Sequence, residues 1–183
     1  MVRPSDSRFV ALLRGVNVGQ AKRVAMADLR DACAGLGYRN VRSLLNSGNL
    51  VFDASGTSVD LAAELTACMR ERFELDVAVT VLNASDVALV EAENELRAVA
   101  TTPSRLLVSL WRDHPAARAR LVEFAEQDWG TERVHVGTRA AYVWCPDGVL
   151  ASHALDALEA ALEGRVTSRN AATWARIVAA VAD

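Results

Sequence analysis

The sequence predicts an α+β protein with two ferredoxin-like halves, each of βαββαβ order, with an antiparallel sheet and helices packed on one face. Short apolar runs of strand length alternate with stretches that repeat apolar residues at helical spacing. This order of elements occurs twice, and Thr101-Thr102-Pro103 lies between the two copies. We therefore predict two domains: residues 1–100, the first half with a connecting helix, and residues 101–183, the second half with a C-terminal helix.

The first half contains four predicted strands and two predicted helices before the connection. The strands are the apolar runs 8–14, 41–45, 50–52 and 76–82. Apolar residues recur at helical spacing from Met26 until Gly35 ends the stretch, and again between Leu61 and Phe73. Residues 84–98 are predicted to form the connecting helix.

The second half repeats this order of elements. Its predicted strands are the segments 105–111, 133–136, 140–144 and 165–168. The second and third of these strands are expected to form a hairpin around Gly137-Thr138. Pro115 suits the first position of a helix, and Ser152 can cap the next one. A last helix carries an apolar stripe that includes Trp174.

Composition is that of an ordinary globular protein. The net charge is −3, which does not favour a protein that binds nucleic acid through bulk positive charge. No apolar run reaches the length of about 18 residues that a membrane span requires. The N-terminal segment lacks the apolar core of a signal peptide, so we expect a cytoplasmic protein.

Neither a cofactor motif nor metal-ligand spacing is present. The cysteines and histidines are few and far apart: Cys33, Cys68, Cys145, His114, His135 and His153. Each cysteine lies among apolar residues, which favours buried free thiols, and the histidines have no near partner in the sequence. The glycines in residues 15–19 match neither the Walker motif nor the dinucleotide motif. We expect no cofactor and no bound metal.

Several segments, in a fixed order, resemble the domain-of-unknown-function 1697 family. They are residues 9–19, 26–30, 36–38, 40–42, 46–52, 167–170 and 173–174. The resemblance extends over nearly the whole chain and implies a bacterial, cytoplasmic α+β protein whose two halves are ferredoxin-like. It implies no activity, because the family is defined without one.

The chain departs from the family pattern at three places. Gln20 stands where the family tends to have a second glycine, and Ala171-Ala172 interrupt the closing motif. The predicted helix before that motif lacks the lysine that the family often carries, and Arg165 is the candidate replacement. If those side chains contact a ligand in the family, the site is altered here.

A polar cluster is expected where the first and third strands meet. These strands are antiparallel neighbours at the centre of a ferredoxin-like sheet, so the loop after residues 8–14 should lie beside the turn at 46–49. Accessible backbone N–H groups and an arginine fork can together bind a phosphate or carboxylate. The predicted ligand-binding residues are Arg14, Gly15, Asn17, Lys22, Ser47, Asn49, Arg169 and Asn170.

The same features also have structural interpretations. Asn46-Ser47-Gly48-Asn49 is typical of a hairpin turn, and Gly15 can simply turn the chain. Asn170 can cap the last helix, and Arg169 can form a salt bridge. Alternatively, Arg169 joins Arg14 at an anion site between the halves.

Two further groups of side chains are interpreted as structural. The acidic residues of the connecting helix are expected to form a solvated surface, and the tryptophans are expected to pack in the core. They are Glu91, Glu93, Glu95, Trp111, Trp129, Trp144 and Trp174.

The function predicted from these observations is binding of a small anionic or nucleotide-like ligand at the Arg14–Asn49 loop cluster. One alternative is an enzyme of unassigned class that uses the same pocket; Ser47 as its nucleophile is disfavoured because no nucleophile elbow surrounds it. Another is a protein-interaction or dimerisation module, in which edge strands would pair two copies of the chain. RNA binding is disfavoured because the expected stacking positions are mostly aliphatic.

Overall fold

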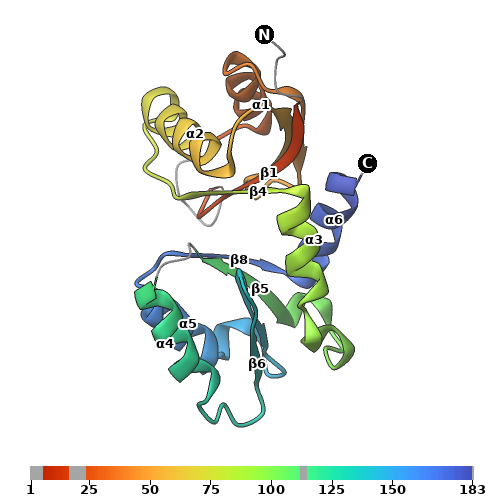
Figure 1. The fold of residues 1–183 in the computed structure, drawn as a ribbon, viewed down its shortest axis with the longest axis vertical. Coiled ribbons are helices and arrows are strands. Elements are labelled where there is room, and N and C mark those ends of the chain that lie inside the picture. The colour runs from red at the N-terminus through yellow and green to blue at the C-terminus, as the bar shows by residue number, and fades with distance from the viewer. Residues whose placement is uncertain (1–5, 17–23, 112–114, 183) are drawn as a thin grey trace. The chain divides into compact units, whose positions relative to one another are not determined.

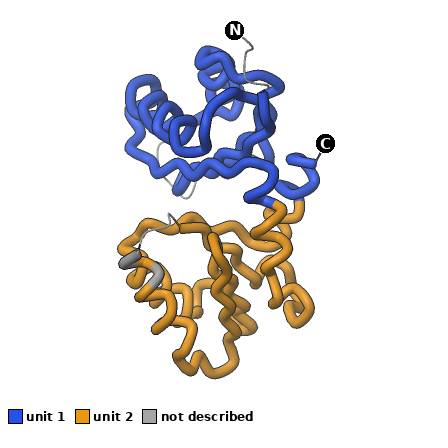
Figure 2. Tube along the Cα trace, viewed as in Figure 1, with its two compact units in different colours: residues 1–87, 176–183 blue, residues 88–175 orange. Residues whose placement is uncertain are grey.

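The computed structural model describes residues 6–16, 24–111 and 115–182, which form two compact units. Unit 1 comprises Met1–Val87 with Arg176–Asp183, and unit 2 comprises Ala88–Ala175 (Figure 2). Each unit contains a four-stranded antiparallel sheet, which confirms the predicted α+β class with two ferredoxin-like halves. The assignment of residues 1–100 and 101–183 as the two domains stays a prediction.

Unit 1 has the strand order β2-β3-β1-β4, with α1 and α2 on one face (Figure 1). Its elements are β1 (Ser7–Leu13), α1 (Met26–Gly35), β2 (Arg39–Leu44), β3 (Asn49–Ala54), α2 (Ser58–Phe73) and β4 (Val79–Asn83). The helix α3 (Ala84–Ala92) follows, and the chain passes from unit 1 to unit 2 within it.

Unit 2 has the equivalent strand order β6-β7-β5-β8, with α4 and α5 on one face. Its elements are the 3-10 helices η1 (Glu95–Ala98), η2 (Pro103–Arg105) and η3 (Val149–Ala151), the strands β5 (Leu106–Trp111), β6 (Arg133–Val136), β7 (Ala140–Trp144) and β8 (Val166–Asn170), and the helices α4 (Pro115–Ala125) and α5 (His153–Ala161). The last helix, α6 (Ala171–Ala182), begins in unit 2 and ends in unit 1.

The core of unit 1 lies between its sheet and the helices α1 and α2. Phe9 and Leu13 are buried in this core, and the rings of Tyr38 and Phe52 stack there with centroids 4.5 Å apart. Leu12 points to the opposite face of the sheet and is also fully buried. Burial on both faces explains why β1 is a continuous apolar run rather than an alternating one.

The core of unit 2 is built in the same way, between its sheet and the helices α4 and α5. Leu107, Leu121 and Leu158 meet there. On the opposite face of the sheet, the Tyr142 hydroxyl donates a buried hydrogen bond to the Val90 carbonyl at 2.6 Å. This bond ties β7 to the end of α3 that belongs to unit 2.

The N-terminus of α5 is held by a local cap and by a carboxylate from another part of unit 2. Ser152 caps the helix as predicted, because its Oγ accepts the Leu155 N–H at 3.1 Å. The buried carboxylate of Glu132 accepts the N–H of His153 at 2.9 Å and the hydroxyl of Ser152. A negative charge at this helix start meets the positive end of the helix dipole. Glu132 thereby fixes α5 to the segment before β6.

Two element boundaries differ from the prediction for a structural reason. β4 begins at Val79 rather than Asp76, because Val79 pairs with Leu13 and β1 ends there. The predicted connecting helix is interrupted, since α3 ends at Ala92 and η1 begins at Glu95. Within the described residues, no helix is both long and apolar enough to cross a bilayer.

Candidate functional site

The loop after β1 and the turn between β2 and β3 touch, as the ferredoxin-like order predicts. The Leu13 N–H donates to the Gly48 carbonyl at 2.8 Å. A Cβ added at Gly48 would stand 3.0 Å from the Leu13 Cβ and 3.2 Å from the Val16 Cβ. We call residues 14–16 and 45–48 together the loop–turn corner of unit 1.

Arg14 and Gly15 form the loop side of this corner. The Arg14 N–H donates to the Ala78 carbonyl at 2.9 Å, so the start of the loop is held against the segment before β4. The Arg14 side chain is half-buried, whereas Gly15 is exposed. Gly15 has a φ of +71°, and no atom of the described residues lies within 4 Å of the position that its Cβ would take.

Asn46 and Ser47 form the turn side of the corner. Leu45 and Gly48 hold positive φ angles of 61° and 69°, which reverse the chain between β2 and β3. Asn49, which the sequence placed in the turn, is the first residue of β3. Asn46 is exposed and Ser47 is half-buried, so both present polar groups at the corner.

Asn49 shapes the turn from inside the protein. Its side chain is fully buried, and its Nδ2 donates to the Leu44 carbonyl and to the Ser47 Oγ, both at 3.0 Å. It therefore orients Ser47, and its direct contact with a ligand stays a prediction. Asn17 and Lys22, the other two predicted ligand residues of this loop, lie outside the described residues.

Arg169 and Asn170 lie in unit 2, at the end of β8. The Asn170 Oδ1 accepts the Thr173 N–H at 2.9 Å, which confirms its predicted role as a cap of α6. Arg169 is cross-strand partner to Val108 and lies on the sheet face opposite α4 and α5. Burial lowers the pKa of its guanidinium to about 10, and its Nη1 donates to the Ser168 carbonyl at 2.9 Å. Its meeting with Arg14 stays a prediction.

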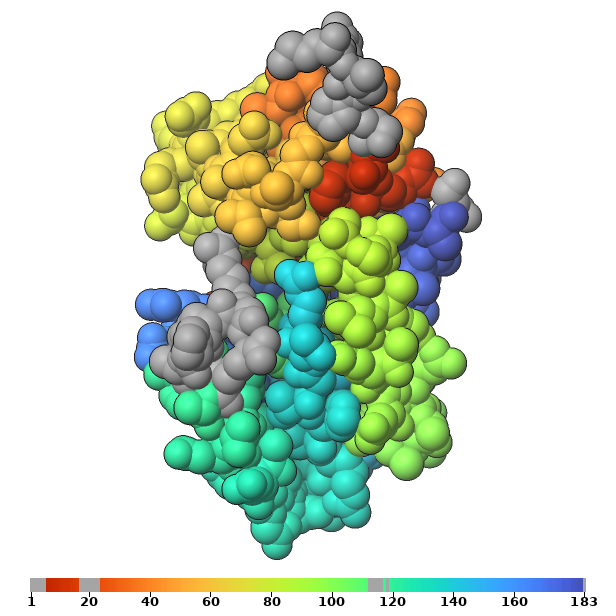
Figure 3. Space-filling model, viewed as in Figure 1, coloured from red at the N-terminus to blue at the C-terminus, as the bar shows by residue number. Residues whose placement is uncertain are grey.

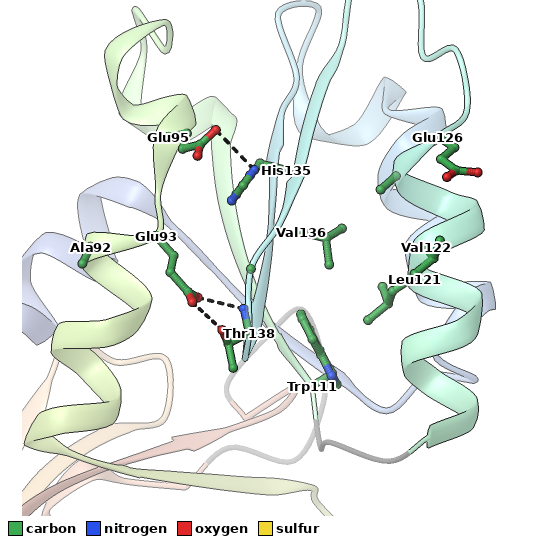
Figure 4. Close-up of a pocket in the computed structure, with 12 residues that line it drawn as sticks. Ala92, Glu93, Glu95, Trp111, Leu121, Val122, Glu126, His135, Val136 and Thr138 are labelled. Carbon is green, nitrogen blue, oxygen red and sulfur yellow. Dashed lines mark hydrogen bonds and ion pairs between the residues drawn. The ribbon is translucent and has the colours of Figure 1, made fainter.

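A pocket of about 650 Å³ in unit 2 was not predicted from the sequence. It lies along the edge strand β6, with α4 on one side and η1 on the other, and Trp111 lines it below Leu121 in Figure 4. Figure 3 shows the surface of β6 (cyan) between α4 (green) and the α3–η1 segment (lime).

The acidic residues after α3 differ in their surroundings: Glu95 is exposed, as predicted, whereas Glu93 is half-buried and bonded to another element. Glu93 accepts the Thr138 N–H at 2.8 Å as well as the Thr138 hydroxyl. Glu95 Oε2 lies 3.5 Å from His135 Nδ1 and gives that histidine an acidic partner. The partners are about 40 to 45 positions apart in the chain, so no local sequence pattern could have revealed these contacts.

The cysteines and tryptophans lie where the sequence predicted, except that Cys68 is only partly buried. Cys33 and Cys145 are buried, Cys68 is half-buried, and all three are free thiols. Trp111, Trp144 and Trp174 are buried, and Trp129 packs against the core of unit 2. No group of three or more histidine, cysteine or acidic residues suited to a metal occurs among residues 6–16, 24–111 and 115–182.

These features define a class of two-unit α+β proteins in which each unit carries a ferredoxin-like sheet. The chain belongs to the family described as "Protein of unknown function (DUF1697)", whose model matches residues 7–142. Among solved structures it is similar to a conserved bacterial protein, SP0830 from Streptococcus pneumoniae, with a TM-score of 0.78 and 20% sequence identity. That likeness covers 97% of this chain and 99% of the other, and it shows a shared fold. A search of the curated proteins finds no match.

Proposed function

We propose that the protein is a cytoplasmic binding protein for a small anionic ligand, and that the loop–turn corner of unit 1 holds this ligand. The observation that carries the proposal is the close packing of Gly48 against Leu13 and Val16. It brings the Arg14–Gly15 loop and the Asn46–Ser47 turn, which come from different strand ends, to one corner of the sheet.

The chemistry of the corner favours an anion. Arg14 supplies a guanidinium, and Asn46 and Ser47 supply amide and hydroxyl donors. Residues 14–16 and 45–48 include no carboxylate. A phosphate or carboxylate group therefore meets donors and a positive charge here.

The test is thermal unfolding of the full chain with inorganic phosphate, nucleoside phosphates, phosphorylated sugars and short RNAs. A ligand present at 100 times its dissociation constant stabilises the folded state by about 2.7 kcal/mol. Arg14→Gln should abolish most of this stabilisation. Arg39→Gln is the matched control, because Arg39 lies at the opposite end of the same sheet, in register with Asp53.

Equal stabilisation of wild type and Arg14→Gln by every ligand that binds would remove the proposed role of the corner. If the protein instead turned over a bound phosphorylated compound, the result would favour the alternative that it is an enzyme using the same residues. A concentration-dependent dimer whose formation is unaffected by Arg14→Gln would instead favour an interaction module.

A further inference from the structure

We propose that Cys33 and Cys68 are a redox-active pair, which closes into an internal disulfide by exchange with a small disulfide such as oxidised glutathione. The two residues belong to different helices of unit 1, α1 and α2, and both are free thiols in this structure. The loop–turn corner contains neither residue, so this inference does not depend on the proposed function.

The helices α1 and α2 pack beside each other on one face of the sheet of unit 1 (Figure 1). Two contacts show which parts of them meet. The Tyr38 hydroxyl, which follows α1, donates to the Glu64 carboxylate of α2 at 2.8 Å. A Cβ added at Gly35, the last residue of α1, would stand 4.0 Å from the Arg72 Nη1. The end of α1 therefore lies beside residues 64–72 of α2.

Cys68 lies in the middle of this part of α2. It comes four residues after Glu64 and four before Arg72, so helical spacing places all three on the side of α2 that faces α1. Cys33 is in the last turn of α1 and is buried in the core of unit 1. Cys68 packs against that same core. The two cysteines thus lie between the two contacts that join the helices.

The ionisation of these groups agrees with their closeness. Burial raises the pKa of Cys33 to about 12, and the charge of Cys68 adds to this shift. The pKa of Tyr38 is also raised, by burial, by its hydrogen bond to Glu64 and the charge of that residue, and by the charges of both cysteines. Because such effects weaken with distance, they place the two sulfur atoms near each other and near the Tyr38 hydroxyl.

The difference in exposure assigns the role of each thiol. Cys68 is half-buried, whereas Cys33 is fully buried. Burial raises the pKa of Cys68, but the positive charge of Arg72 partly offsets this effect and favours the thiolate. A small disulfide can therefore reach Cys68 from solvent. Cys33 is reached from within the unit, through Cys68.

The reaction has two exchange steps. The Cys68 thiolate attacks one sulfur of oxidised glutathione, the bond between the two glutathione sulfurs breaks, and one glutathione leaves as a thiolate that takes up a proton. Cys33 then loses its proton and attacks the Cys68 sulfur, which forms the internal disulfide and releases the second glutathione with that proton. Two protein thiols are oxidised, and the glutathione disulfide is reduced to two thiols.

The experiment is incubation of the folded full chain with oxidised glutathione, followed by alkylation of the remaining thiols, digestion without reduction and mass spectrometry. We expect two peptides joined through Cys33 and Cys68, with release of two glutathione molecules per chain. Dithiothreitol should reverse the link. Cys145, a buried thiol of unit 2, is the internal reference and should remain a free thiol.

Two single variants separate the steps. Cys33→Ala should stop at a mixed disulfide between Cys68 and glutathione, with release of one glutathione per chain, and Cys68→Ala should leave Cys33 unmodified. Cys145→Ala is the matched control and should behave as the wild type. The wild-type protein alone can overturn the proposal: it is wrong if no peptide joined through Cys33 and Cys68 forms, if Cys68 retains glutathione, or if the link forms only in urea.

Discussion

Gly48 lies directly against Leu13: its carbonyl accepts the Leu13 N–H at 2.8 Å, and an added Cβ would stand 3.0 Å from the Leu13 Cβ. No larger residue fits between β1 and the turn without a shift of one of them. This contact fixes the position of the loop relative to the turn. The loop–turn corner is thus held in place by the fold before any ligand binds.

Alanine substitutions at two glycines of the corner should differ in cost. Gly15→Ala meets no atom of the described residues, so we expect it to lower the free energy of unfolding by about 1 kcal/mol through its positive φ alone. Gly48→Ala adds overpacking against Leu13 to the same backbone cost, so we expect about 2 to 4 kcal/mol. Urea unfolding measures both values, and equal losses would show that Gly48 is not tightly packed.

Glu132→Ala should destabilise the protein by about 2 to 3 kcal/mol, because it leaves the N–H groups at the start of α5 without their charged acceptor. Glu123→Ala removes an exposed carboxylate from α4 and should change stability by less than about 0.5 kcal/mol. Thermal and urea unfolding of both variants test this difference. A loss at Glu132 no larger than at Glu123 would contradict the capping role.

Asp53 should make stability depend on pH in the acid range. The hydrogen bond from Arg8, at 2.8 Å, holds the pKa of this carboxyl below its ordinary value of 3.8, and Asn40 donates to it as well. The stabilisation is complete above pH 3.8 and is lost as pH falls through the lower pKa of the folded state. Asp53→Asn should therefore cost stability at neutral pH and progressively less toward acid pH. A constant difference between the two proteins across this range would contradict the assignment.

The three thiols should react at different rates in the folded protein. Burial raises the pKa of Cys33 to about 12, and it also raises that of Cys145. Cys68 is half-buried, and the nearby Arg72 partly offsets the effect of burial on its pKa. Mass spectrometry after brief alkylation should find Cys68 labelled first, since the thiolate is the reactive form. The labelling rate of the protein unfolded in urea serves as the reference. If Cys33 in the folded protein were labelled at that rate, its burial in the core would not protect it, which would contradict the prediction.

Most of the fold could be predicted from local signals. The bounds of β6 and β7 match the prediction, and Ser152 caps α5 as expected, because turn and cap preferences act over a few residues. The contact between the loop after β1 and the turn before β3 was also predictable, since strand order follows from the βαββαβ pattern.

The candidate sites were less predictable, because they depend on side chains that meet across long sequence separations. Asn49 could be chosen as a polar turn residue, but its full burial and its bonds to Leu44 and Ser47 follow from the register of β2 and β3. The Glu95–His135 contact depends on how η1 packs beside β6, which no periodicity encodes.

The most direct test of the anion site is an NMR titration of the isotope-labelled full chain with inorganic phosphate and a nucleoside monophosphate, following each backbone amide. We expect saturable shifts that are largest at residues 14–16 and 45–48 and that disappear in Arg14→Gln. Amides at those positions that do not move when the ligand is in large excess, or shifts centred elsewhere in the chain, would contradict an anion site at the loop–turn corner.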